Sequence, residues 1–289
     1  MVTRPPLTPG PASLPGVSPP PALRRRTLRD AGGLLFALPA ALLLGLWLIP
    51  LGALVLRGTG VEALRYWGDP MVQQALRLSL VTSSIASLLV VLTGTPLAYA
   101  LARWEFRGRA LVDVLIDLTL VLPPAVAGVA LLIAFGRRGV LGPVLGALGI
   151  SLPFTTAAVV LAQMFVAAPF FVRAARIGFD AIDPQLEEAA TTEGATTWQL
   201  FRFVMLPLAG RSLLSGVVLC WTRALGEFGA TILFAGNLAG RTQTMPLAIY
   251  LGFERDVGVA LALSVLLLLV SSLLLLALRR LERSALPAH

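Results

Sequence analysis

Long apolar runs without a single charge constrain this chain more than any other feature. Residues 78–102 carry no charge and lie between Arg77 and Arg103, and residues 257–278 form a second such run. Each run exceeds the roughly 20 residues that an α-helix needs to cross a bilayer. Charged residues make up only 13% of the 289 residues, against about 25% in a typical soluble domain. The chain is therefore predicted to be an all-α, polytopic helical membrane protein.

Six transmembrane helices are predicted from such runs. The first covers residues 31–56, because its uncharged part is long for a cleaved signal peptide and we expect a retained span. The third covers residues 111–135, where the adjacent Pro123 and Pro124 remove two backbone donors and should break or kink the helix. The others are residues 78–102, a fourth span within 139–172 that follows a Gly/Pro-rich loop or short re-entrant piece at 139–152, residues 207–235, and residues 257–278.

The two ends of the chain differ in composition from its apolar middle. Residues 1–30 begin with a proline-rich stretch that has almost no periodic apolar pattern, so we expect a disordered cytoplasmic tail there. Residues 281–289 are expected to form a second, short cytoplasmic tail. The principal domain is predicted to cover residues 70–280 and to include a polar loop at residues 177–206.

Arginine decides the predicted orientation, because all 23 basic residues are arginine. An even number of spans puts both termini on one face, and the arginine-rich face is cytoplasmic by the positive-inside rule. The face that holds the termini is the richer one, with Arg24, Arg25, Arg26, Arg29, Arg103, Arg107, Arg109, Arg173, Arg176, Arg202, Arg279, Arg280 and Arg283. The opposite face holds Arg57, Arg65, Arg137, Arg138, Arg241 and Arg255. Both termini are therefore predicted to be cytoplasmic, in a protein of the inner (plasma) membrane.

The residue inventory excludes several classes of function. The single cysteine, Cys220, rules out an intrachain disulfide, and the single histidine, His289, rules out a histidine metal site or a catalytic triad. Without lysine the chain has no ordinary ATP-binding P-loop. The chain has no basic stripe with interleaved aromatic residues, which is the pattern that would indicate nucleic-acid binding. We therefore expect a protein in the lipid bilayer that is not an enzyme, has no cofactor of its own and binds no nucleic acid.

The polar loop at residues 177–206 has a pattern of its own. Asp183 followed by Pro184 is a favourable helix start, and Glu187 and Glu188 lie early in the helix, where acids are favoured. Gly194 is placed to stop the helix. An apolar cluster then follows, composed of Trp198, Leu200, Phe201 and Phe203. Generic physics leaves two interpretations open: an amphipathic connector at the headgroup boundary, or a surface that docks on another protein.

The spacing within this loop resembles the EAA loop of the permease subunits of bacterial ATP-binding cassette (ABC) importers. The matching positions are Glu188, Ala189, Ala190, Gly194, Val204, Leu206 and Pro207, with valine where isoleucine is usual. The resemblance covers roughly residues 70–280. It implies a type I ABC importer permease fold whose loop forms a coupling helix. It also implies a homodimer, an ATPase partner that docks on the coupling helix and uses the ATP, and an extracytoplasmic binding protein.

Within that family the chain is similar to the oxyanion permeases. The strings that carry this similarity are LVLPPAVAG at residues 120–128, GRRGVLG at 136–142, RALGEFGATILFAGN at 223–237 and RTQTMPLAIY at 241–250. They imply molybdate as the imported anion, with sulfate or tungstate as alternatives. Two other hypotheses are an ion-coupled secondary transporter and an intramembrane enzyme. The chain shows no internal repeat, which argues against the transporter. Its single histidine is terminal, which argues against the enzyme.

Charged side chains inside predicted spans are candidate functional groups, because they are costly in a bilayer unless they are paired or face water. Arg223 and Glu227 are four residues apart and share a helix face, so they could line or gate an anion path or simply neutralise each other between helices. Asp113 and Asp117 also share a face, close in sequence to Arg107 and Arg109, and are expected to be charge-balanced interfacial acids. The kink at Pro123 and Pro124 could be structural or could help to form a gate.

Overall fold

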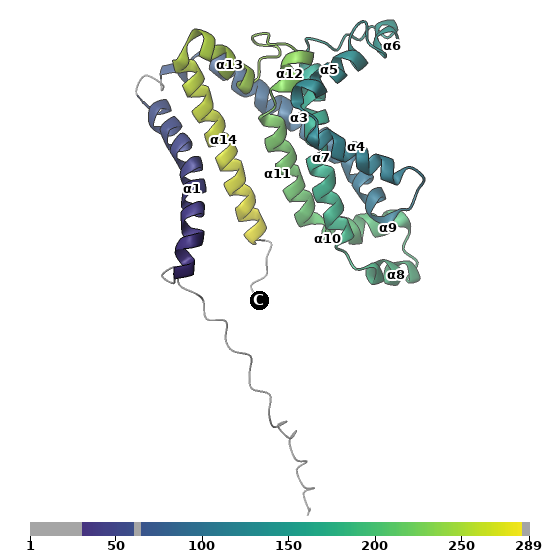
Figure 1. The fold of residues 1–289 in the computed structure, drawn as a ribbon. Helices are drawn as coiled ribbons and strands as arrows, with labels where there is room; N and C mark the ends of the chain where they lie inside the picture. Colours follow the sequence, from purple (N-terminus) through teal and green to yellow (C-terminus); the bar gives the residue numbers. More distant parts are fainter. Residues whose placement is uncertain (1–30, 61–64, 285–289) are drawn as a thin grey trace, which may run out of the picture. The chain divides into compact units, whose positions relative to one another are not determined.

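The computed structural model describes residues 31–60 and 65–284 (Figure 1). Those ranges contain helices, turns and loops, with no strand. The tail predicted for residues 1–30 lies outside them, as do residues 285–289. The chain divides into two compact units, Met1–Leu51 and Gly52–His289.

Helix α1 (Ala31–Gly58) corresponds to the first predicted span. Its segment Leu35–Gly58 is long and apolar enough to cross a membrane, and Pro39 and Pro50 lie inside the helix. Almost all of its large apolar side chains are exposed, among them Leu42, Trp47 and Leu56. Such a surface is suited to lipid contact, because lipid tails are as apolar as leucine.

Three helices form the centre of the second unit: α3 (Pro70–Arg103), α7 (Thr156–Asp180) and α11 (Gly210–Leu225). Polar side chains start the first two, since Asp69 accepts from the amide of Met71 at 2.7 Å and Thr155 accepts from the amide of Ala158 at 3.2 Å. The buried residues where these helices meet are largely small, and the contacts centre on Phe171. Small residues let membrane helices approach closely, which is the main source of their association in lipid.

Helix α14 (Val257–Ser284) contains the sixth predicted span, and residues Val257–Ala277 are apolar enough to cross. The helix before it, α13 (Met245–Arg255), was not expected from the sequence, and it packs against α14. The turn between the two is tight, because a Cβ on Gly252 would lie 3.0 Å from the amide nitrogen of Ala260. A cluster of buried apolar residues joins α13 and α14 to the start of α3 through Val72, Met245 and Leu263.

The third predicted span is split into α4 (Arg109–Val121) and α5 (Pro124–Phe135). The break falls at Leu122 and Pro123, so the helix-breaking effect predicted for the two prolines is confirmed. The region predicted as a loop or short re-entrant piece holds a short helix, α6 (Gly142–Ala147). Helix α7, the fourth span, begins after it and continues to Asp180.

The fifth predicted span is not one continuous helix. It is preceded by α9 (Thr197–Leu200), a π-helical turn η1 (Phe201–Met205) and α10 (Leu206–Leu208), after which the chain bends by 72° into α11. Helix α11 ends at Leu225, and α12 (Gly229–Phe234) follows after a break. The π-turn is consistent with Pro207, because a proline ring clashes with the carbonyl four residues before it in a regular helix and a wider turn relieves that clash.

In the described part of the chain, four helices are each long and apolar enough to cross a membrane, and the bent pair adds a fifth. The predicted count of six spans is therefore not confirmed. The shortfall is the third span, because neither α4 nor α5 is long enough to cross alone.

The contact between α5 and α12 gives a test of this packing. A Cβ added at Gly128 would lie 2.9 Å from both the Cα and the carbonyl oxygen of Ala230, whereas one added at Gly146 would meet nothing within 4 Å. We expect Gly128→Ala to destabilise the protein by about 1–3 kcal/mol through overpacking. The matched Gly146→Ala should be neutral or slightly stabilising. Thermal unfolding of both variants in nanodiscs checks this, and equal melting temperatures would contradict it.

Candidate coupling site and membrane ion pairs

The polar loop forms a short helix, α8 (Pro184–Thr192), where the sequence predicts one. Asp183 is its N-cap: the carboxylate accepts from the amide of Gln185 at 2.9 Å, and Pro184 occupies the first helical position. The hydroxyls of Thr191 and Thr192 donate back to the carbonyls of Glu187 and Glu188. The predicted helix start is confirmed.

Gly194 ends this helix in the left-handed region, with φ of +86°. The amide of Gly194 donates to the carbonyl of Thr191, and the amide of Ala195 donates to the carbonyl of Ala190, both at 3.0 Å. This is the Schellman pattern, in which glycine satisfies the last carbonyls of a helix at no steric cost. The predicted stop at Gly194 is therefore confirmed, and any other residue there would be strained.

The predicted Glu-Ala-Ala positions divide between two faces of α8. Glu188 and Ala189 are exposed, and Leu186 beside them keeps 47% of its surface exposed. Ala190 is half-buried and packs against the core cluster that includes Tyr99, Phe179 and Leu200. The helix thus presents Leu186, Glu188 and Ala189 outward while Ala190 seats it on the bundle.

Arg103, which the sequence did not single out as a functional residue, ties α8 to the end of α3. Its guanidinium forms an ion pair with Glu187 through Nε and donates from Nη2 to the carbonyl of Ile182 at 2.8 Å. The side chains of Arg103 and Glu187 keep only 14% and 20% of their surface exposed. One arginine therefore holds both the residue before the α8 N-cap and the first turn of α8.

Aromatic rings fix the second half of the loop. The ring of Tyr99 in α3 lies 5.5 Å from Phe179 and 5.0 Å from Phe201, and Trp198 lies 5.8 Å from Phe201. Edge-to-face contacts at these separations stabilise beyond simple burial. In the apolar cluster predicted from the sequence, Leu200 is buried and Phe201 is half-buried, whereas Trp198 and Phe203 are exposed.

The last three predicted coupling positions, Val204, Leu206 and Pro207, directly precede α11. Val204 packs against the same core cluster, Leu206 is half-buried, and Pro207 is exposed. They belong to the wide turn and the bend that connect the loop to the fifth span. The seven positions of the EAA spacing therefore lie along one stretch of chain that runs from α8 to the bend.

Arg223 and Glu227 form an ion pair at the end of α11, with Nη1 and Oε2 2.8 Å apart. Glu227 keeps 1% of its side-chain surface exposed, and its Oε1 accepts from the amide of Ala230 at 2.7 Å. The pair therefore connects the end of α11 to the first turn of α12 across the break between them. This geometry suits a structural role, and a role in the anion path stays a prediction.

The breaks in the third and fifth spans meet. A Cβ on Gly229, the first residue of α12, would lie 2.8 Å from the Cβ of Pro124, the first residue of α5. Helices α5 and α12 then pack closely along Gly128 and Ala230. The predicted gate candidates Pro123, Pro124 and Glu227 are thus brought into one region.

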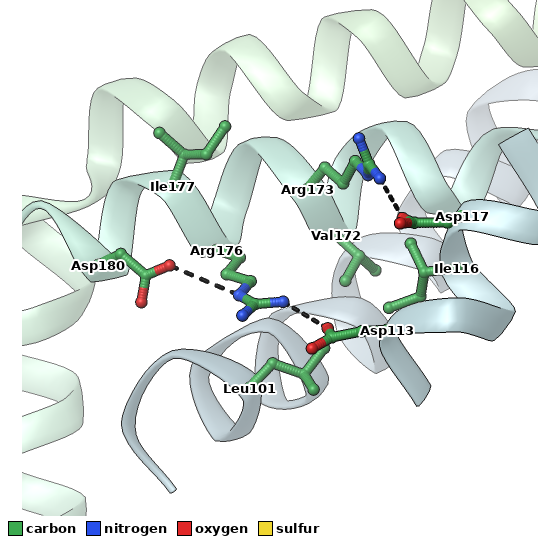
Figure 2. A pocket seen from close by; sticks show the side chains of 9 residues that line it. All are labelled: Leu101, Asp113, Ile116, Asp117, Val172, Arg173, Arg176, Ile177 and Asp180. Carbon is green, nitrogen blue, oxygen red and sulfur yellow. Dashed lines mark hydrogen bonds and ion pairs between the residues drawn. The ribbon is translucent and has the colours of Figure 1, made fainter. Parts of the chain in front are cut away.

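Asp113 and Asp117 pair with arginines of α7 and not with the arginines near them in sequence. Figure 2 shows Asp117 facing Arg173, and Arg176 lying between Asp113 and Asp180. The charges are balanced as expected, but by Arg173 and Arg176. Arg107 and Arg109 make no ion pair within residues 31–60 and 65–284.

Comparison with known proteins identifies the chain. Residues 94–286 match the family model described as "Binding-protein-dependent transport system inner membrane component". The chain belongs to this family. It is 45% identical over 231 residues to the molybdenum transport system permease protein ModB of Mycobacterium tuberculosis, covering 79% of this chain and 86% of ModB. It is 37% identical over 239 residues to the sulfate transport system permease protein CysT of Escherichia coli, covering 81% and 86%.

Solved structures show the same fold at low sequence identity. A bacterial ABC transporter that imports the polysaccharide alginate aligns with a TM-score of 0.71 and 17% identity, over 88% of this chain and 96% of that chain. The MetNI methionine ABC transporter aligns with a TM-score of 0.55 and 20% identity, over 82% and 99%. The permease has the type I ABC importer fold, as the EAA spacing implied.

The tether at Arg103 gives a test of how α8 is held. We expect Arg103→Ala to raise hydrogen exchange of the α8 amides about tenfold or more, because the variant loses a charge-assisted bond and leaves Glu187 unpaired. Arg107→Ala is the matched control, since Arg107 is an exposed arginine of the same end of the bundle. Hydrogen exchange read by mass spectrometry checks this. Unchanged protection of residues 184–192 in Arg103→Ala would show that the tether does not hold the helix.

The buried Glu227 gives a second test. Arg223→Ala leaves this carboxylate buried without its partner, which should lower stability by about 3–5 kcal/mol. Adding Glu227→Gln to Arg223→Ala should recover part of the loss, because the amide oxygen still accepts from Ala230 and carries no charge. The control Arg57→Ala, at an exposed site, should change stability by less than about 0.5 kcal/mol. Assembly yield and thermal unfolding measure both, and wild-type values for Arg223→Ala would contradict the expected role.

Proposed function

We propose that the permease imports an oxyanion, most specifically molybdate, by alternating access driven by a partner ATPase. The observation that carries the ATP-coupled part is α8, a rigidly capped helix that presents Leu186, Glu188 and Ala189 to the outside. Arg103 and Tyr99 support this helix from the membrane bundle. A short helix that is exposed on one face and anchored on the other is suited to carry movement of a docked partner into the bundle.

Molybdate as the cargo rests on the relatives. ModB proteins named for molybdenum transport are 40–45% identical to this chain, including those of Mycobacterium tuberculosis and Escherichia coli. The sulfate permease CysT of Escherichia coli, at 37%, keeps sulfate as the alternative, together with tungstate. An ion-coupled secondary transporter has no support from the family to which the chain belongs.

The assembly follows the same logic. Two copies of the chain would form the pathway between them, two ATPase subunits would dock at α8 and use the ATP, and an extracytoplasmic binding protein would deliver the anion. One solved relative is an alginate transporter in complex with its substrate-bound periplasmic protein. The permease itself would need no cofactor, since ATP is bound by the partner.

Orientation follows from the arginines at the α8 end of the bundle. Helices α6 and α8 lie at opposite ends of α7 (Figure 1). The end near α8 carries Arg103, Arg107, Arg109, Arg173 and Arg176. Arginine-rich ends of membrane helices face the cytoplasm, so α8 would be cytoplasmic and the loop around α6 would face outward. Both termini would be cytoplasmic if the chain has the even number of spans predicted from its sequence.

The pathway would pass the region where the broken spans meet. Pro123 and Pro124 break the third span, and Arg223 and Glu227 close the break in the fifth. Broken helices at membrane depth commonly mark substrate paths and gates, because free backbone groups there can be satisfied by substrate or by neighbouring helices. These four residues are therefore the gate candidates of the proposal.

The cargo is tested in vesicles. The permease would be purified with its ATPase and reconstituted with its binding protein, and ATP-dependent uptake of molybdate would be measured with sulfate and tungstate as competitors. We expect uptake that requires ATP and that molybdate saturates at lower concentration than sulfate. If sulfate competed more strongly than molybdate, sulfate would be identified as the cargo. Uptake driven by an ion gradient without ATP would overturn the ATP-coupled mechanism.

The coupling role of α8 is tested by two substitutions, one on its exposed face and one at its end. Glu188→Lys changes an exposed residue of the proposed docking face, and Gly194→Asp strains the turn that ends the helix. Both should lower uptake per ATP hydrolysed by about tenfold, the scale of a lost coupling free energy, with little change in thermal unfolding. Glu105→Lys is the matched control, because Glu105 is an exposed acid at the same end of the bundle. Normal transport in both variants would show that α8 does not couple the ATPase.

A further inference from the structure

Helix α4 is attached to the bundle differently from its neighbours. None of its residues is buried, and Leu111, Val114, Leu118 and Val121 each keep more than half of their surface exposed. Its helical backbone is interrupted at both ends: Gly108 lies in the left-handed region with φ of +95°, and Leu122 and Pro123 separate it from α5. Of its apolar side chains, Val112 and Ile116 are half-buried and pack against the core cluster, so apolar packing holds only one narrow face of α4.

Two ion pairs hold α4 on α7. Asp113 and Asp117 are one turn apart on α4, and Arg176 and Arg173 are nearly one turn apart on α7, so the pairs Asp113–Arg176 and Asp117–Arg173 form side by side (Figure 2). Arg176 also reaches Asp180, with Nε and Oδ2 3.5 Å apart. A slip of α4 by one turn would leave only one carboxylate opposite an arginine. The two pairs together therefore set the register of α4 on α7.

A pocket that is open to the surface lies beside these pairs. Its volume is about 410 Å³, and it is lined also by Leu101, Ile116, Val172 and Ile177. Partly exposed ion pairs contribute little to overall stability, so these pairs serve position more than stability.

The other half of the broken third span is fixed elsewhere. Helix α5 packs closely on α12 through Gly128, Ala230 and Leu233. One half of the span is thus bound to the C-terminal half of α7, and the other packs with α12 on the N-terminal half of α7. The joint at Leu122 and Pro123 lies between them. A movement of the C-terminal end of α7 relative to α5 and α12 would change the angle at this joint.

Helix α7 leads directly into the coupling loop. Asp180, the second partner of Arg176, is the last residue of α7, and the N-cap of α8 follows at Asp183. We propose that Arg173 and Arg176 are positioning residues that make α4 follow the coupling loop, through an ionic clasp with Asp113 and Asp117. The clasp transmits movement of α8 and the end of α7 to α4, while α5 stays on α12. This inference rests on the proposed coupling role of α8.

The test uses the isolated pair Asp117–Arg173 in the complete transport complex. The variants are Arg173→Asp, Asp117→Arg and the exchange of both charges in one chain, with Arg107→Asp as the matched control. Spin labels at Val114→Cys and Ile177→Cys, both exposed positions, report the α4–α7 distance by electron paramagnetic resonance. Labels at Ile133→Cys and at Leu238→Cys, an exposed position just after α12, report the α5–α12 distance. The only native cysteine, Cys220, is buried.

Each single reversal should broaden the α4–α7 distance distribution, leave the α5–α12 distribution unchanged and lower uptake per ATP hydrolysed by about five- to tenfold. The charge exchange should restore both quantities to within about twofold, because it rebuilds the pair with opposite polarity. ATPase binding should be unchanged in all variants, which separates the clasp from docking at α8.

Two results would overturn the clasp: single reversals that leave the α4–α7 distribution narrow, or a charge exchange that restores neither distance nor coupling. Failure of the proposed function would look different. In that case the wild-type complex would bind no ATPase or import no oxyanion, while the spin-label distances would still report whether the two pairs hold α4 on α7.

Discussion

Close packing of small residues in α3, α7 and α11 is the constraint on which the rest of the permease depends. A Cβ on Gly94 of α3 would lie 2.9 Å from the ring of Phe171 in α7, and one on Gly216 of α11 would lie 3.1 Å from the same ring. A Cβ on Gly178 would lie 2.4 Å from the Cβ of Ser212. Lipid tails give helices no hydrophobic reason to associate, so the close approach that these glycines allow must supply the attraction. The three helices form a closely packed frame, and they cannot come closer without clashes.

The coupling site is built on this frame. Arg103 is the last residue of α3, and Tyr99 lies one turn before it, so both reach α8 and its following turn from a fixed support. The broken segments lie outside the frame and contact one another, as α5 and α12 do at Pro124 and Gly229. Rigid helices therefore carry the docking element, and interrupted ones are left to change shape.

Helices that depend on neighbouring residues in the sequence could be predicted from hydropathy and from capping residues. The uncharged runs gave α3, α7 and α14, Asp183 with Pro184 gave the start of α8, and Gly194 gave its end. The ion pairs between α4 and α7 could not be predicted, because Asp113 and Arg176 are 63 residues apart and adjacent arginines offered equally plausible partners. The break after Leu225 was missed because the sequence stays apolar on both sides of it, and α13 was missed because it is shorter than a span.

Two kinds of contact divide the work within the permease. Small-residue packing has no preferred partner atom, but it holds helices at one separation over several turns, which suits α3, α7 and α11. Ion pairs are directional and recur once per turn, so they fix register and rotation while contributing little to stability when partly exposed. Arg103 and Arg176 each contact two groups, one on a neighbouring element and one at the edge of the coupling loop. Charge at the end of the bundle is thus concentrated where α4 and α8 must keep their alignment with the frame.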